Sequence, residues 1–120
     1  DKDLLKDFNT FCFMFESLCM RDLKIYSESI DGEVYYYRDN NDLECDAIIH
    51  LDNGKWGAIE VKLGGNEAQD EAARNLLKIK NIVDENAMGS PSFLMILTGT
   101  KYAFKREDGV LVVPLGCLKD

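Results

Sequence analysis

A chain of 120 residues with 46% hydrophobic side chains is long enough for one globular domain and too apolar for intrinsic disorder. Its 14 basic and 22 acidic residues give a net charge of −8, which argues against a protein that coats nucleic acid through a generally basic surface. No apolar run reaches the roughly 20 residues that a membrane-spanning helix needs, so we expect a cytoplasmic protein with no membrane partner. Because the sequence begins without Met inside an amphipathic pattern, we expect residues 1–120 to be a single domain cut from a longer protein.

The first predicted element is a helix over about residues 3–24. Apolar side chains recur there every three or four residues, which is the spacing of a helix with one face in the core. Glu16 interrupts the pattern, because it is the only charged residue between Asp7 and Arg21 and falls on the flank of the apolar stripe. A carboxylate in that position either reaches water at the rim of the core or has a partner, and the sequence leaves both interpretations open.

Three antiparallel strands are expected after this helix. The stretch 33–38 is rich in aromatic residues and is followed by a polar turn. The stretches 44–51 and 55–63 are also strand-like, and the Asp-Asn-Gly sequence between them is a hairpin signal. These strands would form one contiguous meander.

The second half of the chain predicts a helix, a buried strand and a closing hairpin. Two glycines end the strand pattern, and Asn66 followed by Gln69 resembles a capping box that opens a helix. Residues 92–97 have the continuous apolarity of a strand buried on both faces, and 101–105 with 110–114 read as a hairpin. The expected fold is therefore α/β, in the order helix, three strands, helix, strand and a two-stranded addition.

The turn between the second and third strands decides which ionisable side chains share a face. Glu44 and Asp46 lie two residues apart on one strand, as Glu60 and Lys62 do on the next. A two-residue Asn-Gly loop would put Asp46 and Glu60 on opposite sides of the sheet. A three-residue loop over 52–54, with its glycine left-handed, would place Asp46 opposite Glu60 and Glu44 opposite Lys62. Both loops are chemically acceptable.

The three-residue loop would create a site with metal-dependent chemistry. Two carboxylates directly opposite each other, with Cβ atoms about 5 Å apart, repel unless a cation lies between them. Oxygen ligands in an open site suit Mg²⁺ or Mn²⁺ better than zinc. Lys62 would orient or deprotonate a water there, or steady the charge of a phosphoryl transition state, and Glu16 would complete the acidic set if the first helix packs on this side. The competing interpretation is a sheet edge with ordinary solvated ion pairs.

Glu16, Asp46 and the run Glu60-Val61-Lys62 resemble the active-site pattern of the PD-(D/E)xK nuclease-like superfamily. Cys45 stands where the name of that pattern has proline. The resemblance implies a restriction-endonuclease-like core of helix, three antiparallel strands, helix and strand, here with a C-terminal β-hairpin. Four segments also look like an uncharacterised domain that follows the P-loop (AAA-type) ATPase module of a large bacterial and archaeal protein family, namely 15–18, 36–46, 56–62 and 108–115.

The resemblance also implies roles for the individual residues. It assigns metal ligation to Asp46, Glu60 and the carbonyl of Val61, catalysis to Lys62, and an auxiliary acidic role to Glu16. The cofactor would be Mg²⁺ or Mn²⁺. The partners would be nucleic acid, with DNA ahead of RNA, and a P-loop ATPase module in the full-length chain, and a homodimer stays open. The alternative is a catalytically silent binding, regulatory or dimerisation module with the same fold.

Two further patterns have a structural and a functional interpretation. The run Tyr35-Tyr36-Tyr37 would be able to stack on bases, although strand alternation buries one or two of the rings and a core strand is the stronger interpretation. Basic residues concentrate in 72–106, where they would contact a phosphate backbone or form a solvated face.

Overall fold

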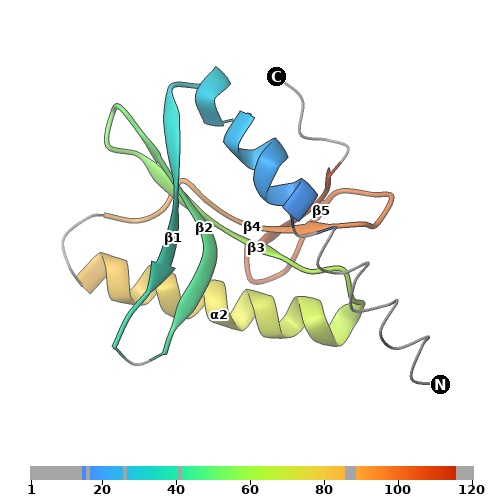
Figure 1. Cartoon of the computed structure of the whole chain (residues 1–120). Coiled ribbons are helices and arrows are strands. Elements are labelled where there is room, and N and C mark those ends of the chain that lie inside the picture. Colours follow the sequence, from blue (N-terminus) through green and yellow to red (C-terminus); the bar gives the residue numbers. More distant parts are fainter. Residues whose placement is uncertain (1–14, 16, 26, 41, 86–88, 116–120) are drawn as a thin grey trace.

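A six-stranded sheet lies between two helices in the computed structural model, which describes residues 15, 17–25, 27–40, 42–85 and 89–115 (Figure 1). Residues 15, 17–25 and 27–29 are helical and precede the first strand. The remaining elements are β1 (Gly32–Arg38), β2 (Glu44–Leu51), β3 (Trp56–Val61), α2 (Asn66–Glu85), β4 (Phe93–Thr98), β5 (Phe104–Lys105) and β6 (Leu111–Pro114). The chain is thus a mixed α/β fold, as the sequence predicts.

The sheet has the strand order β1-β2-β3-β4-β6-β5. The strands β1, β2 and β3 pair antiparallel, as expected for a meander, whereas β3 and β4 pair parallel. A parallel pair needs a crossover, and α2 supplies it. The closing hairpin adds β6 parallel to β4 and leaves β5 at the edge. As a result β3 is central, and all six of its residues are buried.

The two faces of the sheet carry separate hydrophobic clusters, one under each helix. On one face, Leu76 and Ile79 of α2 pack with Trp56 and Ala58 of β3. On the other face, the first helix contributes Cys19 and Leu23, which pack with the alternate residues of the same strand. No helix in the described part of the chain is long and apolar enough to cross a membrane.

The helix ends differ from the sequence-based expectation by a few residues. Helical residues continue past Lys24 to 27–29, where the hydroxyl of Ser27 donates to the carbonyl of Lys24 at 2.9 Å. At the start of α2, the amide of Gln69 donates to the carbonyl of Gly65 at 3.0 Å. Gly65 is therefore the N-cap residue of α2, one residue before Asn66, which the capping-box pattern had predicted. Glycine is accepted at this position.

A close approach between β3 and β4 depends on the absence of a side chain at Gly57. A Cβ added there would lie 2.3 Å from Cζ of Phe93, its neighbour in the parallel pair. We expect Gly57→Ala to lower the free energy of unfolding by about 1–3 kcal/mol, because it overpacks this contact. The measurement is urea unfolding of a double-mutant cycle with Phe93→Ala. Equal costs of Gly57→Ala with and without the ring would contradict this explanation.

Candidate functional site

The hairpin between β2 and β3 has the three-residue loop. The amide of Leu51 donates to the carbonyl of Lys55 at 2.8 Å, and Gly54 has a φ of 87°, in the left-handed region. Ala47 is paired with Ile59, so one step further along the ladder Asp46 comes opposite Glu60. Of the two loops compatible with the sequence, the structure has the one that brings the two carboxylates to the same face.

The carboxyl groups of Asp46 and Glu60 meet where β2 and β3 begin to separate. Asp46 accepts a hydrogen bond from the amide of Val61 at 2.8 Å, so main chain of the neighbouring strand holds its carboxylate in place. Glu60 is only 6% exposed. Its burial, then its hydrogen bond to Asp46 and the charge of Asp46, raise the pKa of Glu60 to about 8, while Asn75 and Lys62 act in the opposite direction. Glu60 is therefore a buried acid that holds its proton near neutral pH.

A β-bulge in β2 shapes this end of the strand. Tyr35 pairs with Ile48 and Tyr37 pairs with Cys45, so three steps along β2 match two steps along β1. Cys45 packs into the cluster under α2, and its thiol donates to the carbonyl of Ala47 at 3.3 Å. Burial raises the pKa of Cys45 to about 12, which leaves it a neutral packing residue beside Asp46.

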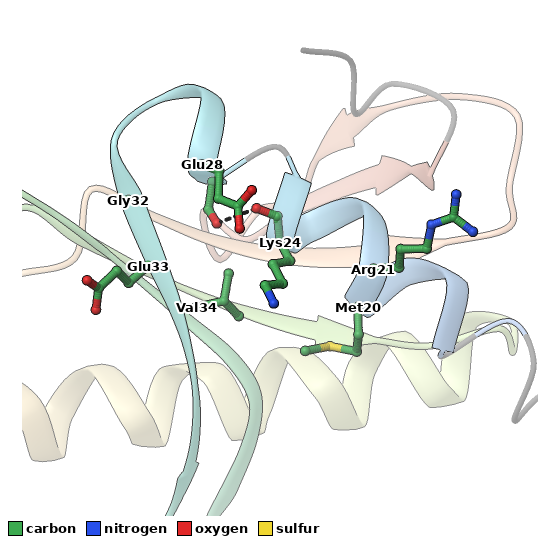
Figure 2. A pocket seen from close by; sticks show the side chains of 8 residues that line it. Met20, Arg21, Lys24, Glu28, Gly32, Glu33 and Val34 are labelled. Atoms are coloured by element: carbon green, nitrogen blue, oxygen red, sulfur yellow. Dashed lines mark hydrogen bonds between the residues drawn. The ribbon is translucent and has the colours of Figure 1, made fainter.

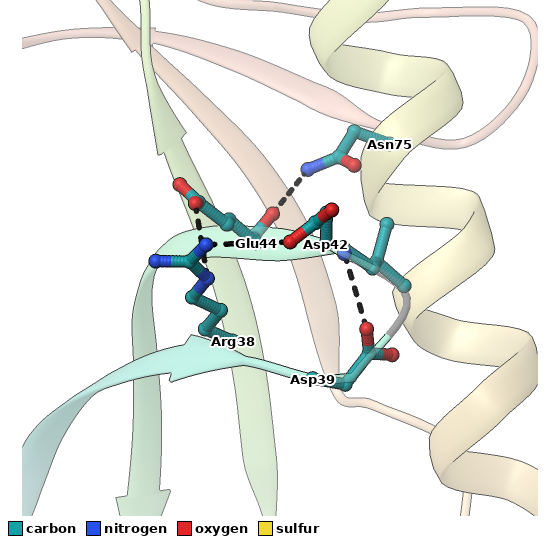
Figure 3. A network of polar contacts seen from close by, with 6 residues as sticks. Arg38, Asp39, Asp42, Glu44 and Asn75 are labelled. Carbon is teal, nitrogen blue, oxygen red and sulfur yellow. Dashed lines mark hydrogen bonds and ion pairs between the residues drawn. The ribbon is translucent and has the colours of Figure 1, made fainter.

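Asn75 of α2 ties the helix to both strands of the site. Its side-chain amide donates to the carbonyl of Glu44 at 2.6 Å, as Figure 3 shows, and also to a carboxyl oxygen of Glu60. Outside this contact, Arg38 forms exposed ion pairs with Asp42 and Glu44. Sequence reasoning missed Asn75, although its signal was there: an amide beside the apolar stripe of α2 that includes Leu76.

A polar pocket of about 370 Å³, which we call the acidic pocket, lies beside Glu60 and Asn75. Asp46, Glu60 and Lys62 lie on the strand side, and Arg74 and Lys78 line it from α2. Lys62 directly follows β3, and its amide donates to the carbonyl of Leu97 at 2.9 Å. The structure thus brings three of the predicted site residues to one cavity and adds two cations from the helix.

The structure says less about the other two predicted site residues, Val61 and Glu16. Val61 lies between Glu60 and Lys62 in the chain, with its side chain in the cluster under the first helix. Glu16 lies outside the described residues. Within the described ranges, no group of three or more His, Cys, Asp or Glu side chains forms a metal-binding cluster. Asp46 and Glu60 provide two acidic side chains, one fewer than such a cluster needs. Metal binding there stays a prediction.

A larger cavity, of about 600 Å³, lies on the opposite face between the first helix and β1 (Figure 2). Its charged residues are Arg21, Lys24, Glu28 and Glu33, and all four are exposed. Solvated charges of both signs make weak ion pairs and have no need of a bound ion. The buried Glu60 makes the acidic pocket the stronger candidate for chemistry, despite its smaller volume.

A family model described as a domain of unknown function, DUF4143, matches residues 11–118 of the chain. The chain belongs to the DUF4143 family. No curated protein and no solved structure matches the chain. The match covers every strand, α2 and the predicted site residues Asp46, Glu60 and Lys62. The acidic pocket therefore lies within the DUF4143 domain itself.

The raised pKa of Glu60 predicts how the stability of the metal-free domain depends on pH. Between the ordinary pKa of 4.5 and the folded value of about 8, folded Glu60 holds a proton that the unfolded chain releases. The contribution of Glu60 to the free energy of unfolding is therefore lost as pH rises through this window. Urea unfolding in EDTA from pH 5 to 8 should show this loss in the wild type and a flatter profile in Glu60→Gln. Parallel profiles for the two proteins would contradict the assignment.

The two hydrogen bonds of Asn75 predict a stabilising role. We expect Asn75→Ala to lower the free energy of unfolding by about 1–3 kcal/mol, because the carbonyl of Glu44 and the buried Glu60 lose their donor. Asn81, an exposed residue of the same helix, is the matched control. Asn81→Ala should be neutral or slightly stabilising, since alanine favours helix. Chemical denaturation of both variants makes the comparison, and similar losses would rule out a specific role for Asn75.

Proposed function

We propose that this DUF4143 domain is a Mg²⁺- or Mn²⁺-dependent phosphodiesterase of the nuclease type. The proposal rests on one observation: Asp46 and Glu60 meet on adjacent strands, in a pocket that Lys62 also lines. Two opposed carboxylates beside a lysine are the groups that metal-assisted phosphodiester hydrolysis uses. In the same proposal the domain has a restriction-endonuclease-like core, acts on nucleic acid with DNA ahead of RNA, and is attached to a P-loop ATPase module in a longer chain.

The order of the elements supports the proposed relationship to the PD-(D/E)xK superfamily. A helical segment, three antiparallel strands, a crossover helix and a parallel strand follow one another, and a hairpin is added at the end. Asp46 lies on the second strand and Glu60 on the third, which are the positions that the resemblance assigns to the metal-binding acids. Function does not follow from fold alone, so the chemistry of the pocket carries the greater weight.

The residues of the pocket fit a hard divalent cation. Asp46 and Glu60 would provide carboxylate oxygens and Val61 a carbonyl oxygen, which is the ligand type that Mg²⁺ and Mn²⁺ prefer. A ligand set this small leaves positions for water and phosphate. The cation would replace the proton of Glu60, and its positive charge would hold both groups as carboxylates. When bound, it supplies the positive charge that stabilises a phosphate group as negative charge builds up on its oxygens.

The other groups would position the reactants. Lys62 follows Glu60 by two residues and lines the same pocket, so its ammonium group would hold a phosphate oxygen or orient the attacking water. Asn75 would keep the carboxylate of Glu60 turned towards the pocket through its hydrogen bond. The auxiliary acidic role that the resemblance gives to Glu16 stays a prediction, since the described part of the first helix packs on the face opposite α2 and none of its residues lines the acidic pocket.

Cleavage assays combined with metal titration test this function. We expect the wild type to cut DNA in Mg²⁺ or Mn²⁺ and to gain thermal stability when the ion is added. Asp46→Asn and Glu60→Gln should lose both effects. Lys62→Ala should lose activity by roughly 10²- to 10³-fold and still bind the ion, because it removes a charge that acts on the transition state. Lys101→Ala, an exposed lysine outside the pocket, is the matched control.

The same experiment addresses the alternative of a catalytically silent binding, regulatory or dimerisation module. That alternative is favoured by the hydrogen bond between Asn75 and Glu60, which satisfies a buried acid without any cation. A wild-type domain that cuts neither DNA nor RNA, and whose melting temperature ignores both ions, would establish the silent module and end the nuclease proposal.

A further inference from the structure

A second pocket lies on the α2 side of the sheet, and its walls are almost entirely apolar and aromatic. This tyrosine pocket has a volume of about 340 Å³. It is formed by the three tyrosines of β1, by Ile48 and His50 of β2, by Trp56 at the start of β3 and by Val83 near the end of α2. The proposed hydrolysis at the acidic pocket makes no use of it.

Two of the tyrosines are not packed as core residues. Tyr35 is 49% exposed and Tyr36 is 60% exposed, on a strand that forms one edge of the sheet. The hydroxyl of Tyr35 donates to Glu33 of the same strand, so the ring is held by its own strand. Flat aromatic surface beside an apolar pocket is hydrophobic area that a ligand can still bury.

The tyrosine pocket and the acidic pocket both lie on the α2 side of the sheet. Glu60 lines the acidic pocket, and Ile48 and Trp56, which pack in the cluster under α2, line the tyrosine pocket. Helix α2 also contributes to both, with Lys78 at the acidic pocket and Val83 at the tyrosine pocket. Five residues of helix separate these two by about 7.5 Å along its axis. Both pockets therefore lie along the same helix, within about a turn and a half of each other.

One pocket is charged and the other is aromatic, as are the phosphate and the base of a nucleotide. Beside the acidic pair, Arg74 and Lys78 offer exposed cations that suit a phosphate. Arg106 is not available for this purpose, because Asp70 at 2.9 Å and Asp108 at 3.2 Å hold its guanidinium group. The tyrosine pocket offers aromatic faces, which suit a planar base.

We propose that the two pockets together bind an unpaired strand of nucleic acid. One phosphate lies in the acidic pocket beside Arg74 and Lys78, and the neighbouring base stacks on Tyr35 in the tyrosine pocket. The inference rests on the proposed phosphodiesterase function and adds its substrate class, a single strand instead of a duplex. In a duplex each base is already stacked and paired, whereas an unpaired base can present its face to an aromatic side chain.

Fluorescence anisotropy with a labelled short oligothymidine, and with the same label on a duplex, tests the stacking contact. Ca²⁺ replaces Mg²⁺ and Mn²⁺ so that binding is followed apart from cleavage. We expect Tyr35→Ala to weaken single-strand binding by roughly 5- to 100-fold, which corresponds to the loss of one stacked base. Tyr35→Phe keeps the ring and should bind within about twofold of the wild type, since stacking needs no hydroxyl. Because Tyr35 is half exposed, both variants should keep the wild-type melting temperature.

The salt dependence of the same binding tests the phosphate contact. Losing two phosphate contacts in Arg74→Ala/Lys78→Ala should reduce the slope of log K against log salt by about 1.4 for a single strand. Lys101→Ala/Lys105→Ala removes two exposed cations that do not line the acidic pocket and should leave the slope unchanged.

Three results would overturn the inference: single-strand affinity unchanged in Tyr35→Ala, tighter binding to the duplex, or a slope that falls equally in both double variants. Light scattering identifies the main competing occupant. A dimer of the wild type that dissociates in Tyr35→Ala would assign this face to a second copy of the chain and likewise refute strand binding. Tyr35-dependent binding without cleavage in Mg²⁺ or Mn²⁺ would instead refute the proposed activity and leave the strand-binding site in place.

Discussion

The hairpin loop after β2 is the constraint on which the candidate site depends. Side chains alternate along a strand, so a loop one residue shorter would turn Asp46 to the face opposite Glu60. Gly54 prevents this, because its φ of 87° closes a three-residue loop that most other residues would strain. The contact of the two acids, the hydrogen bond of Asp46 to Val61 and the position of Lys62 all follow from that register.

The contact between Asp46 and Glu60 is one that stability alone would not select. A buried carboxyl that must keep its proton beside a second carboxylate costs free energy at neutral pH, and a hydrophobic pair at the same position would not. The surrounding structure accommodates the contact with a bulge in β2 and an amide donor from Asn75. An unfavourable local contact that the surrounding structure compensates is typical of a functional site.

Local patterns predicted most of the fold. The meander, α2 and the closing hairpin each follow from alternation, helical spacing or turn residues within a single stretch of chain. The placement of β6 beside β4 did not follow, because pairing between distant strands leaves no local signal. The candidate site was predicted only up to a choice between two loops. The bulge beside Cys45 and the contact of Asn75 with Glu60 depend on the packed sheet and helix, which the sequence does not display residue by residue.

The net charge of −8 gains a more specific meaning from the acidic pocket. Around that pocket the carboxylates outnumber the cations Lys62, Arg74 and Lys78, so a phosphate meets repulsion there as long as no divalent cation is bound. A divalent cation would offset that excess and let the three cations act on the phosphate. Because coupling between two ligands is reciprocal, a phosphate held beside Arg74 and Lys78 would in turn tighten the hold of Asp46 and Glu60 on the cation. An acidic domain of this design would reject polyanions in general and still accept a strand that arrives together with its metal.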